Sequence, residues 1–425
     1  MGESVKAIRW GWIMLFVAVD LVLTAIFGGW LSQARVDPLL SLAPRMASAA
    51  LLVWALRNEE RPASRWLHYG LAIALGFAVQ MLVALILSAR FSWGQGVAAA
   101  LLSLPAFAFL DWLAHWLKGV RFSAGLLAVV ALILSLLTAL GVRTAYDRAA
   151  YPQADAAERP RLAVLTSLPI VWGEALSGGN EGFAAALDGR AQSAPALAAL
   201  ERRFAVTMLD AIDARSLPKP TDRDAVLLMA HPGGLSPAEL VALDGWVRQG
   251  GKALILADAL LIWEPPFAIG DPRNPPVTSL LTPLLDHWGL ELALSANDNA
   301  QITQIWDDGE PLLLPASGYF VERREADGVS CSLSRGGIRA DCAVGKGRVT
   351  LLSDADMLQD FLWLGSAAIA TESAGASGPA LWRSGNLAWV QDRLLAFSGQ
   401  KQQLWLKPVW MGERAADKMS APTKP

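Results

Sequence analysis

The pattern of apolar and polar positions divides this chain near Arg143. Before that residue, long apolar segments are separated by short polar connections, as in helices that cross a bilayer. After Arg161 the apolar runs become short, which is typical of buried strands. We expect a transmembrane domain over residues 1–145, a linker over 146–160, an α/β domain over 161–400 and a C-terminal tail over 401–425. The expected spans lie near residues 11–31, 39–56, 69–89, 96–117 and 123–142.

The first apolar segment has Trp12 and Trp30 at its two ends. As a helix it would separate them by about 27 Å, close to the hydrocarbon thickness, and tryptophan favours the membrane interface. Ser32-Gln33-Ala34 has the spacing of small residues that a signal peptidase reads. Because this span is long for a signal peptide and more spans follow, we expect an uncleaved anchor. Cleavage would remove one span without moving the C-terminal domain.

The distribution of Lys and Arg predicts the orientation. If the N-terminus is cytoplasmic, seven basic residues lie in the inside segments and three in the outside loops. The inside residues are Lys6, Arg9, Arg57, Arg61, Arg65, Lys118 and Arg121, and the outside residues are Arg35, Arg45 and Arg90. Five crossings then place the α/β domain in the periplasm of a bacterial inner membrane. An even number of spans would reverse this prediction.

The second part of the chain alternates strand and helix patterns. Short apolar runs at 161–167, 204–209, 225–230 and 252–257 predict buried strands. Between the last two, Ser236 and Glu239 form the pattern of a capping box, with Pro237 at the first helical position. This order predicts a doubly wound, mostly parallel sheet.

The two cysteines predict a small β-hairpin insertion. A two-residue turn at Gly336-Gly337 pairs residues whose numbers sum to 673, as Cys331 and Cys342 do. They would face each other closely enough for a disulfide in an oxidising compartment. The alternatives are two reduced thiols or a different register. With no further cysteine, a Cys-x-x-Cys redox site or a cysteine-based zinc site is excluded.

Composition and charge exclude several classes of protein. The chain is 53% hydrophobic and only 18% charged, which is too apolar for an ordinary soluble protein. A net charge of −3 without a cluster of basic and aromatic residues argues against nucleic acid as a partner. The sequence contains neither a glycine-rich phosphate loop nor a metal-ligand motif. We expect no cofactor and no metal, and the chain is not itself an ATPase.

Two carboxylates lie within expected membrane spans. Asp20 is in the middle of the first span, and Asp111 is in the fourth, beside His115. A carboxylate in hydrocarbon usually faces a partner or water, so both are candidate intramembrane sites. Asp20 can also pair with Arg45 or accept hydrogen bonds from Ser or Thr in a neutral form, and Asp111 can lie near the interface.

Several segments of the second part carry a family resemblance. They are His231-Pro-Gly-Gly-Leu-Ser-Pro-Ala-Glu-Leu, Leu243-Asp-Gly-Trp-Val-Arg-Gln-Gly-Gly-Lys-Ala-Leu-Ile-Leu-Ala-Asp258, Gly270-Asp-Pro-Arg-Asn-Pro-Pro276, Leu284-Leu-Asp-His-Trp-Gly289, Gly347-Arg-Val-Thr-Leu-Leu-Ser-Asp-Ala-Asp356 and Gly385-Asn-Leu-Ala-Trp-Val390. In order and spacing they resemble the periplasmic domain of ABC-transporter auxiliary proteins related to the gliding-motility component GldG. The resemblance covers about residues 160–398.

The resemblance implies a fold like that of class I glutamine amidotransferases, used without known catalysis beside a separate ATPase and permease. Family members typically have one span before this domain, whereas about five are expected here. An amidotransferase needs a nucleophilic cysteine after a strand, and this chain has His231-Pro-Gly-Gly at that place. We therefore expect no enzyme activity.

Candidate binding residues follow the expected strands, because open α/β sheets bind ligands outside the carboxyl ends of their strands. His231, Asp258, Asp354 and Asp356 lie just past strands, and Asp271 and Arg273 lie in a proline-rich loop that could cover the same edge. Each has a structural alternative. An Asp after a strand often caps the next helix, His231 precedes a tight turn, and Asp271 with Arg273 can simply fix their own loop.

Three hypotheses for the function remain. The first is a non-catalytic, membrane-anchored accessory subunit of an ABC-type transport or envelope system, with the lipid bilayer, an ATPase and a permease as partners. The second is an envelope scaffold that works without an ATPase. The third is a degenerate hydrolase.

Overall fold

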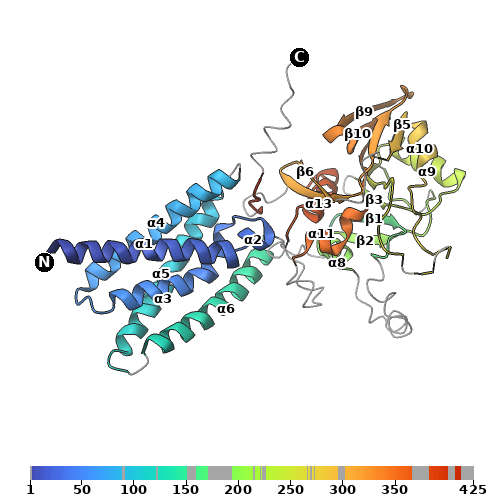
Figure 1. Cartoon of the computed structure of the whole chain (residues 1–425). Helices are drawn as coiled ribbons and strands as arrows, with labels where there is room; N and C mark the ends of the chain where they lie inside the picture. Colours follow the sequence, from blue (N-terminus) through green and yellow to red (C-terminus); the bar gives the residue numbers. More distant parts are fainter. Residues whose placement is uncertain are drawn as a thin grey trace, which may run out of the picture. The chain divides into compact units, whose positions relative to one another are not determined.

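The computed structural model describes most of the chain (Figure 1). It covers residues 2–88, 91–120, 123–150, 159–170, 194–213, 216–220, 222, 226–265, 267–268, 270–271, 273–294, 302–365, 382–400 and 407–412. Residues 151–158 of the expected linker, and 401–406 and 413–425 of the expected tail, lie outside the described residues. The chain forms two compact units: one contains residues 1–152, 379–383 and 403–425, and the other contains 153–378 and 384–402.

The first unit consists mainly of apolar helices. Its elements are α1 (Gly2–Phe27), α2 (Trp30–Gln33), η1 (Pro38–Ser41), α3 (Leu42–Leu56), α4 (Pro62–Leu87), α5 (Trp93–Trp116) and α6 (Ser123–Ala150). In the described part of the chain, five helical segments are long and apolar enough to cross a membrane. The predicted helical membrane part is therefore confirmed at the level of fold class.

Helix ends in this unit follow from local chemistry. Gly29 has a φ of 93°, which separates α1 from α2 because other residues rarely adopt that conformation. Pro44 lies in the first turn of α3, where a missing N–H removes no helical hydrogen bond. Helix α6 runs to Ala150, beyond the expected end of the fifth span near residue 142 and into the segment expected to be a linker.

The segment Lys407–Gly412 packs against the helical unit although it lies at the other end of the sequence. The Val36 N–H donates to the Val409 carbonyl, and the Met411 N–H donates to the Ala34 carbonyl, both at 2.8 Å. We call this segment the C-terminal strap. It adds an extended piece of chain to the connection between α2 and η1.

Arg35 fixes the C-terminal strap in a buried position. Its side chain is ion-paired with Asp37 and donates a hydrogen bond to the Tyr146 hydroxyl at 3.1 Å. The guanidinium also lies 5.4 Å from the ring centroids of Tyr146 and Trp410. Both Arg35 and Trp410 have no exposed surface, so cation–π contacts and the ion pair act here without competition from water.

The second unit is built on a twisted sheet with the strand order β2-β1-β3-β4-β11-β10-β9. These strands are β1 (Arg161–Thr166), β2 (Ala205–Met208), β3 (Val226–Ala230), β4 (Lys252–Leu256), β9 (Val329–Ser334), β10 (Arg339–Val344) and β11 (Gly347–Leu352). Neighbours from β2 through β11 pair in parallel, whereas β10 pairs antiparallel with both β11 and β9. This confirms the predicted mostly parallel sheet.

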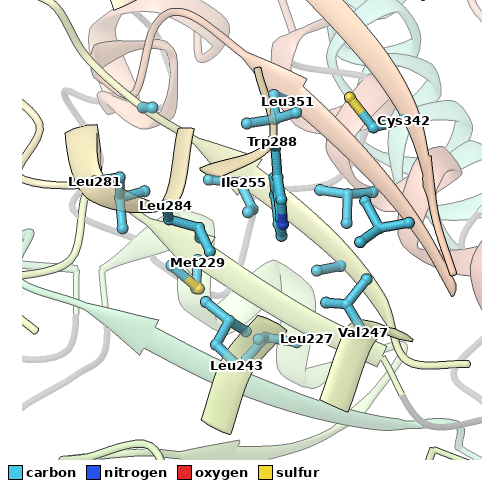
Figure 2. Packing of buried hydrophobic residues seen from close by; sticks show 14 of the residues in the cluster. Leu227, Met229, Leu243, Val247, Ile255, Leu281, Leu284, Trp288, Cys342 and Leu351 are labelled. Carbon is cyan, nitrogen blue, oxygen red and sulfur yellow. The ribbon is translucent and has the colours of Figure 1, made fainter. Parts of the chain in front are cut away.

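Two hydrophobic layers cover the two faces of this sheet. One layer packs α9 (Pro237–Arg248) and α10 (Thr282–His287) on the sheet through Leu243, Val247 and Trp288 (Figure 2). The other packs α13 (Asn386–Ser398) and α8 (Pro195–Glu201) on the opposite face. Trp288 is 2% exposed, and burying so large a ring contributes about 2–3 kcal/mol.

Short elements complete the unit. The small sheets are β5 (Leu290–Ala293) with β8 (Tyr319–Glu322), and β6 (Ile302–Asp307) with β7 (Glu310–Pro315). The remaining helical turns are η3 (Arg335–Gly337), η4 (Asp356–Leu358) and α11 (Asp360–Trp363).

The β9–β10 hairpin has the register expected from the sequence. Cys331 lies opposite Cys342, and a disulfide joins them with a Cα–Cα distance of 4.1 Å. The connection differs from the expected two-residue turn. Ser334 and Arg339 form the last pair, so four residues containing η3 make the turn around the same centre.

Candidate functional site

Three neighbouring parallel strands, β3, β4 and β11, end at the same edge of the sheet. His231 directly follows β3, Asp258 follows β4, and Asp354 and Asp356 follow β11. All four residues have no exposed surface. The structure therefore brings four of the six candidate binding residues to one buried edge, which we call the strand-end cluster.

Asp258 connects the ends of β4 and β11. One carboxylate oxygen accepts the Leu260 N–H at 3.0 Å. The other accepts the N–H groups of Ala355 and Asp356 at 2.8 and 3.3 Å. Three backbone donors that would otherwise be buried without a partner are thus satisfied by one side chain.

Asp354 and Asp356 also bind backbone groups. Asp354 accepts the Met357 N–H at 2.8 Å, which starts the turn η4. Asp356 accepts the Ile262 N–H at 2.8 Å and the Gln359 side-chain amide at 2.7 Å. The described contacts of these carboxylates are those of residues that hold loops together.

His231 has an unusual backbone conformation, with a φ of 45°. Its N–H donates to the Leu256 carbonyl at 2.8 Å, and its Nε2 lies 2.7 Å from the Pro276 carbonyl, so Nε2 carries the proton. Nδ1 is buried and makes no hydrogen bond to a described residue. Burial lowers the pKa of His231, against the opposing effects of the Pro276 carbonyl and Asp258, so the ring is neutral near pH 7.

Asp271 and Arg273 do not join the strand-end cluster. Their side chains are hydrogen-bonded to each other at 2.7 Å, and Arg273 lies 3.9 Å from the ring centroid of Phe267. Hydrogen bonds from Arg273 hold the pKa of Asp271 at about 2. The loop reaches the cluster through the Pro276 carbonyl instead, so these two residues fix their own loop.

Burial changes the protonation of the cluster. It raises the pKa of Asp258, and, together with the charge of Asp258, it raises the pKa of Asp356 to about 7. Near neutral pH the pair therefore carries less negative charge than two ordinary carboxylates would.

We expect the strand-end cluster to lose stability as the pH rises. An unfolded Asp titrates near pH 4 and folded Asp356 near pH 7, so between these values the folded state binds more protons. This stabilisation is complete below about pH 4 and is lost by about pH 7. The side chain of the Asp356→Asn variant cannot ionise. The stability of the variant relative to the wild type should therefore increase by at least about 1 kcal/mol as the pH rises from 5 to 8.

Hydrogen exchange of peptides covering 352–359, measured in the full chain in detergent, tests this change. The variant and the wild type are compared at each pH, which removes the intrinsic pH dependence of exchange. A difference that stays constant from pH 5 to pH 8 would contradict the raised pKa. Asp271→Asn is the matched control, since its partly exposed carboxylate titrates below this range.

A second charged cluster was not predicted from the sequence. Asp307, 2% exposed, accepts hydrogen bonds from Arg335, Arg339 and Trp389 at 2.7–3.0 Å. Burial opposes ionisation, but Arg339 and the other donors outweigh it and lower the pKa of Asp307. In the sequence, Asp307 is part of Trp-Asp-Asp-Gly, which indicates only a turn.

The candidate carboxylates of the helical unit lie in two separate polar clusters. Asp20 is ion-paired with Arg45 at 3.2 Å and accepts hydrogen bonds from Ser48 and Gln80, both at 2.9 Å. All four side chains are at least 93% buried. The sequence left open an ion pair with Arg45 or a hydrogen bond from a Ser or Thr side chain. In the structure, Asp20 pairs with Arg45 and also accepts a hydrogen bond from the Ser48 hydroxyl.

Asp111 has partners from a neighbouring helix. Arg65 lies 3.2 Å from its carboxylate, and the Tyr69 hydroxyl donates to it at 2.8 Å. His115 contacts the Asp111 carbonyl at 2.9 Å. Of these three partners, His115, four residues away on the same helix, is the one that the sequence indicated.

The described residues of the strand-end cluster do not form a nucleophile–histidine–acid arrangement. Ser236 caps α9, accepting the Glu239 N–H at 3.3 Å, as its sequence pattern predicted. Directly after β3, where the sequence resemblance would place the cysteine nucleophile of an active amidotransferase, the chain has His231. Among the described residues, no group of three or more His, Cys, Asp and Glu side chains is arranged to hold a metal ion.

Comparison with known proteins gives one family match. Residues 159–299 match the family model described as an ABC-type uncharacterized transport system. No match was found among curated proteins.

Several solved structures are similar to this chain at low identity. An exo-β-1,4-mannosidase from Opitutaceae bacterium strain TAV5 is 17% identical with a TM-score of 0.29, over 60% of this chain and 39% of the mannosidase. A ThuA-like protein from Bacteroides uniformis is 11% identical with a TM-score of 0.24, over 60% of this chain and 100% of that protein. A β-galactosidase from Rahnella sp. R3 is 13% identical with a TM-score of 0.24, over 60% of this chain and 35% of the galactosidase. Likeness at these scores carries no argument about function.

Proposed function

We propose that the protein is a non-catalytic, membrane-anchored accessory subunit of an ABC-type system, because its residues 159–299 match the model of the ABC-transporter auxiliary family. The family match is the observation that carries the proposal. It includes β1, β3, α9 and β4, and therefore the strand ends that carry His231 and Asp258. Because the matched family is a transport family, the partners would be a separate ATPase and permease.

The contacts of the strand-end cluster support a binding or coupling role. Asp258 and Asp356 bind backbone N–H groups, which leaves them poorly placed to exchange protons with a substrate. Such bonds keep the loops after β4 and β11 in one conformation. A fixed edge of this kind suits recognition of a partner, since little ordering entropy is lost on binding.

The five apolar helices support anchoring in the bilayer. With the N-terminus in the cytoplasm, five crossings would put the α/β unit in the periplasm of a bacterial inner membrane. The charge bias of the loops supports this orientation.

Co-purification tests the proposed function. We expect an affinity-tagged full-length chain, extracted from its native membranes with a mild detergent, to bring down an ABC ATPase and a permease identified by mass spectrometry. The untagged chain in the same membranes is the control. Recovery of envelope proteins without any nucleotide-binding subunit would support the scaffold alternative and contradict the proposal.

Reporter fusions test the proposed orientation separately. Alkaline phosphatase fused after Pro425 should be active, because it folds only in an oxidising compartment. The same reporter fused within the connection between α3 and α4 should be inactive. The reverse pattern would overturn the periplasmic assignment while leaving the transport role open.

A further inference from the structure

Strand β9 forms one edge of the large sheet. It pairs with β10 on one side, and no described strand lies on its other side (Figure 1). Edge strands present unpaired backbone groups that another chain can bind, so natural proteins usually protect them with charges, prolines or bulges. Strand β9 reads Val-Ser-Cys-Ser-Leu-Ser and contains no charge and no proline.

The pairing with β10 determines which backbone groups of β9 face outward. The Cα–Cα distance of 4.1 Å between Cys331 and Cys342 is that of a non-hydrogen-bonded pair. The Gly345 N–H donates to the Gly328 carbonyl at 2.9 Å, in the alternate set of pairs. Even-numbered residues of β9 therefore bond to β10, and the backbone groups of Cys331 and Leu333 point away from it.

The outward groups are available in the described part of the chain, with one exception. The Val329 N–H donates to the Ala326 carbonyl at 3.1 Å, which leaves the Val329 carbonyl on the edge. Leu333 is 37% exposed, whereas Val329 and Cys331 are partly covered by the hydrophobic layer around α9. The disulfide joins the two strands of the hairpin, so the edge is held in an extended conformation.

The sequence around this edge is complementary to itself. If two copies pair antiparallel about a twofold axis at Cys331, residues whose numbers sum to 662 face each other. Val329 then faces the partner's Leu333, an apolar pair that occurs twice. Just beyond the strand, in the turns at its two ends, Asp327 and the partner's Arg335 come to the same end of the ladder, which gives opposite charges at both ends.

Exposure of the charged residues is consistent with this pairing. Asp327 and Arg335 are both exposed, and the Arg335 side chain keeps 33% of its surface while its Nε donates to Asp307. Both therefore lie at the surface where a second chain would arrive.

We propose that β9 pairs with β9 of a second copy of this chain, antiparallel and centred on Cys331, so that the sheets of two copies become continuous. The Cys331 N–H of each chain donates to the partner's Cys331 carbonyl. Each Leu333 N–H donates to the partner's Val329 carbonyl. The interface is isologous, since both copies contribute the same surface.

A second copy fits this edge better than an unrelated peptide does. An unrelated chain would need its own apolar and charged residues at matching positions. A twofold axis at Cys331 supplies the apolar pair and the charged pair from one sequence. The ladder is short, and on its own it would be weak. On the proposed membrane anchoring, two copies in one bilayer have a high effective concentration, which a short ladder requires.

Cysteine cross-linking in membranes tests the register. Ser330 of one copy and Ser332 of the other face each other as a non-hydrogen-bonded pair, with Cα atoms about 4.5 Å apart, near enough for a disulfide. We expect two differently tagged full-length chains, one with Ser330→Cys and one with Ser332→Cys, to form a disulfide-linked dimer under mild oxidation. The control pair, Ser330→Cys with Ser334→Cys, is displaced by two residues and should give roughly tenfold less product.

Backbone and charge variants make the test independent of the added cysteines' reactivity. Leu333→Pro removes an outward N–H without removing a bond to β10, and should abolish the cross-link, whereas Leu333→Ala should keep it. Mass spectrometry after alkylation checks that the Cys331–Cys342 disulfide still forms. Asp327→Arg should weaken the cross-link, because it places like charges at both ends of the ladder, whereas Asp327→Asn should weaken it less.

The opposite results would overturn the proposal. They are no dimer from the 330–332 pair, equal dimer from the 330–334 pair, or unchanged cross-linking in Leu333→Pro with an intact hairpin disulfide. If Leu333→Pro lacks that disulfide, the charge variant decides, and unchanged cross-linking in Asp327→Arg rejects the pairing. Because cross-linking needs no ATPase or permease, its failure is distinguishable from failure of the proposed function.

Discussion

Replacing Asp20 with leucine is expected to destabilise the helical unit by about 3–5 kcal/mol, because it leaves a buried arginine without its counter-ion. Arg45 is 1% exposed and lies 3.2 Å from Asp20. Ser48 and Gln80 also lose an acceptor. Thermal unfolding of the full chain in detergent, followed by size-exclusion chromatography after heating, measures the effect.

The double variant Asp20→Leu with Arg45→Met is the informative control. Removing both charges of a buried pair is often close to neutral, so most of the lost stability should return. Asp20→Asn should be intermediate, because it keeps an acceptor but not the charge. If Asp20→Leu alone unfolds at the wild-type temperature, the two residues are not a buried ion pair.

Replacing Asp258 with alanine is expected to loosen the strand-end cluster. The variant leaves the N–H groups of Leu260, Ala355 and Asp356 without their acceptor in a buried place. At about 1 kcal/mol or more for each group, the loss is about 3 kcal/mol. Hydrogen exchange of peptides covering 257–263 and 352–359 should accelerate about 100-fold relative to the wild type.

Two variants decide whether Asp258 acts by holding the loops or by binding a partner directly. Asp258→Asn keeps a carbonyl acceptor and should accelerate exchange less than alanine does. Asp271→Ala, on an exposed loop, should leave the exchange of the cluster unchanged. The Asp258→Ala variant could lose partner co-purification and yet show the hydrogen-exchange rates of the wild type. That result would mean that the carboxylate contacts the partner and that its structural role is small.

The elements that could be predicted from the sequence depend on local patterns. The capping box at Ser236 and Glu239 involves residues three positions apart, and the apolar spans follow from hydropathy within single segments. The hairpin register follows from the position of the two glycines between the cysteines. In each case one short stretch contains all the partners, so tertiary context was not needed.

Contacts between distant segments could not be predicted. Arg65 was assigned to a cytoplasmic connection, yet it binds Asp111 from the first turn of α4, a helix that starts earlier than its apolar core indicates. The partners of Asp307 come from η3, β10 and α13, and no spacing in the sequence connects them. The position of candidate residues after strands was predictable, but their use as backbone acceptors depends on loop geometry.

The C-terminal strap changes how the α/β unit is attached. The chain leaves the helical unit after α6, returns to it at residues 379–383, and returns again at Lys407–Gly412, where Trp410 is buried against Arg35. The α/β unit is thus an insertion whose chain connects to the helical unit on both sides, through α6 and through the later segments. A single backbone cut in the connection after α6 would therefore not release it, since the hydrogen bonds and ring contacts of the strap would still hold the other end.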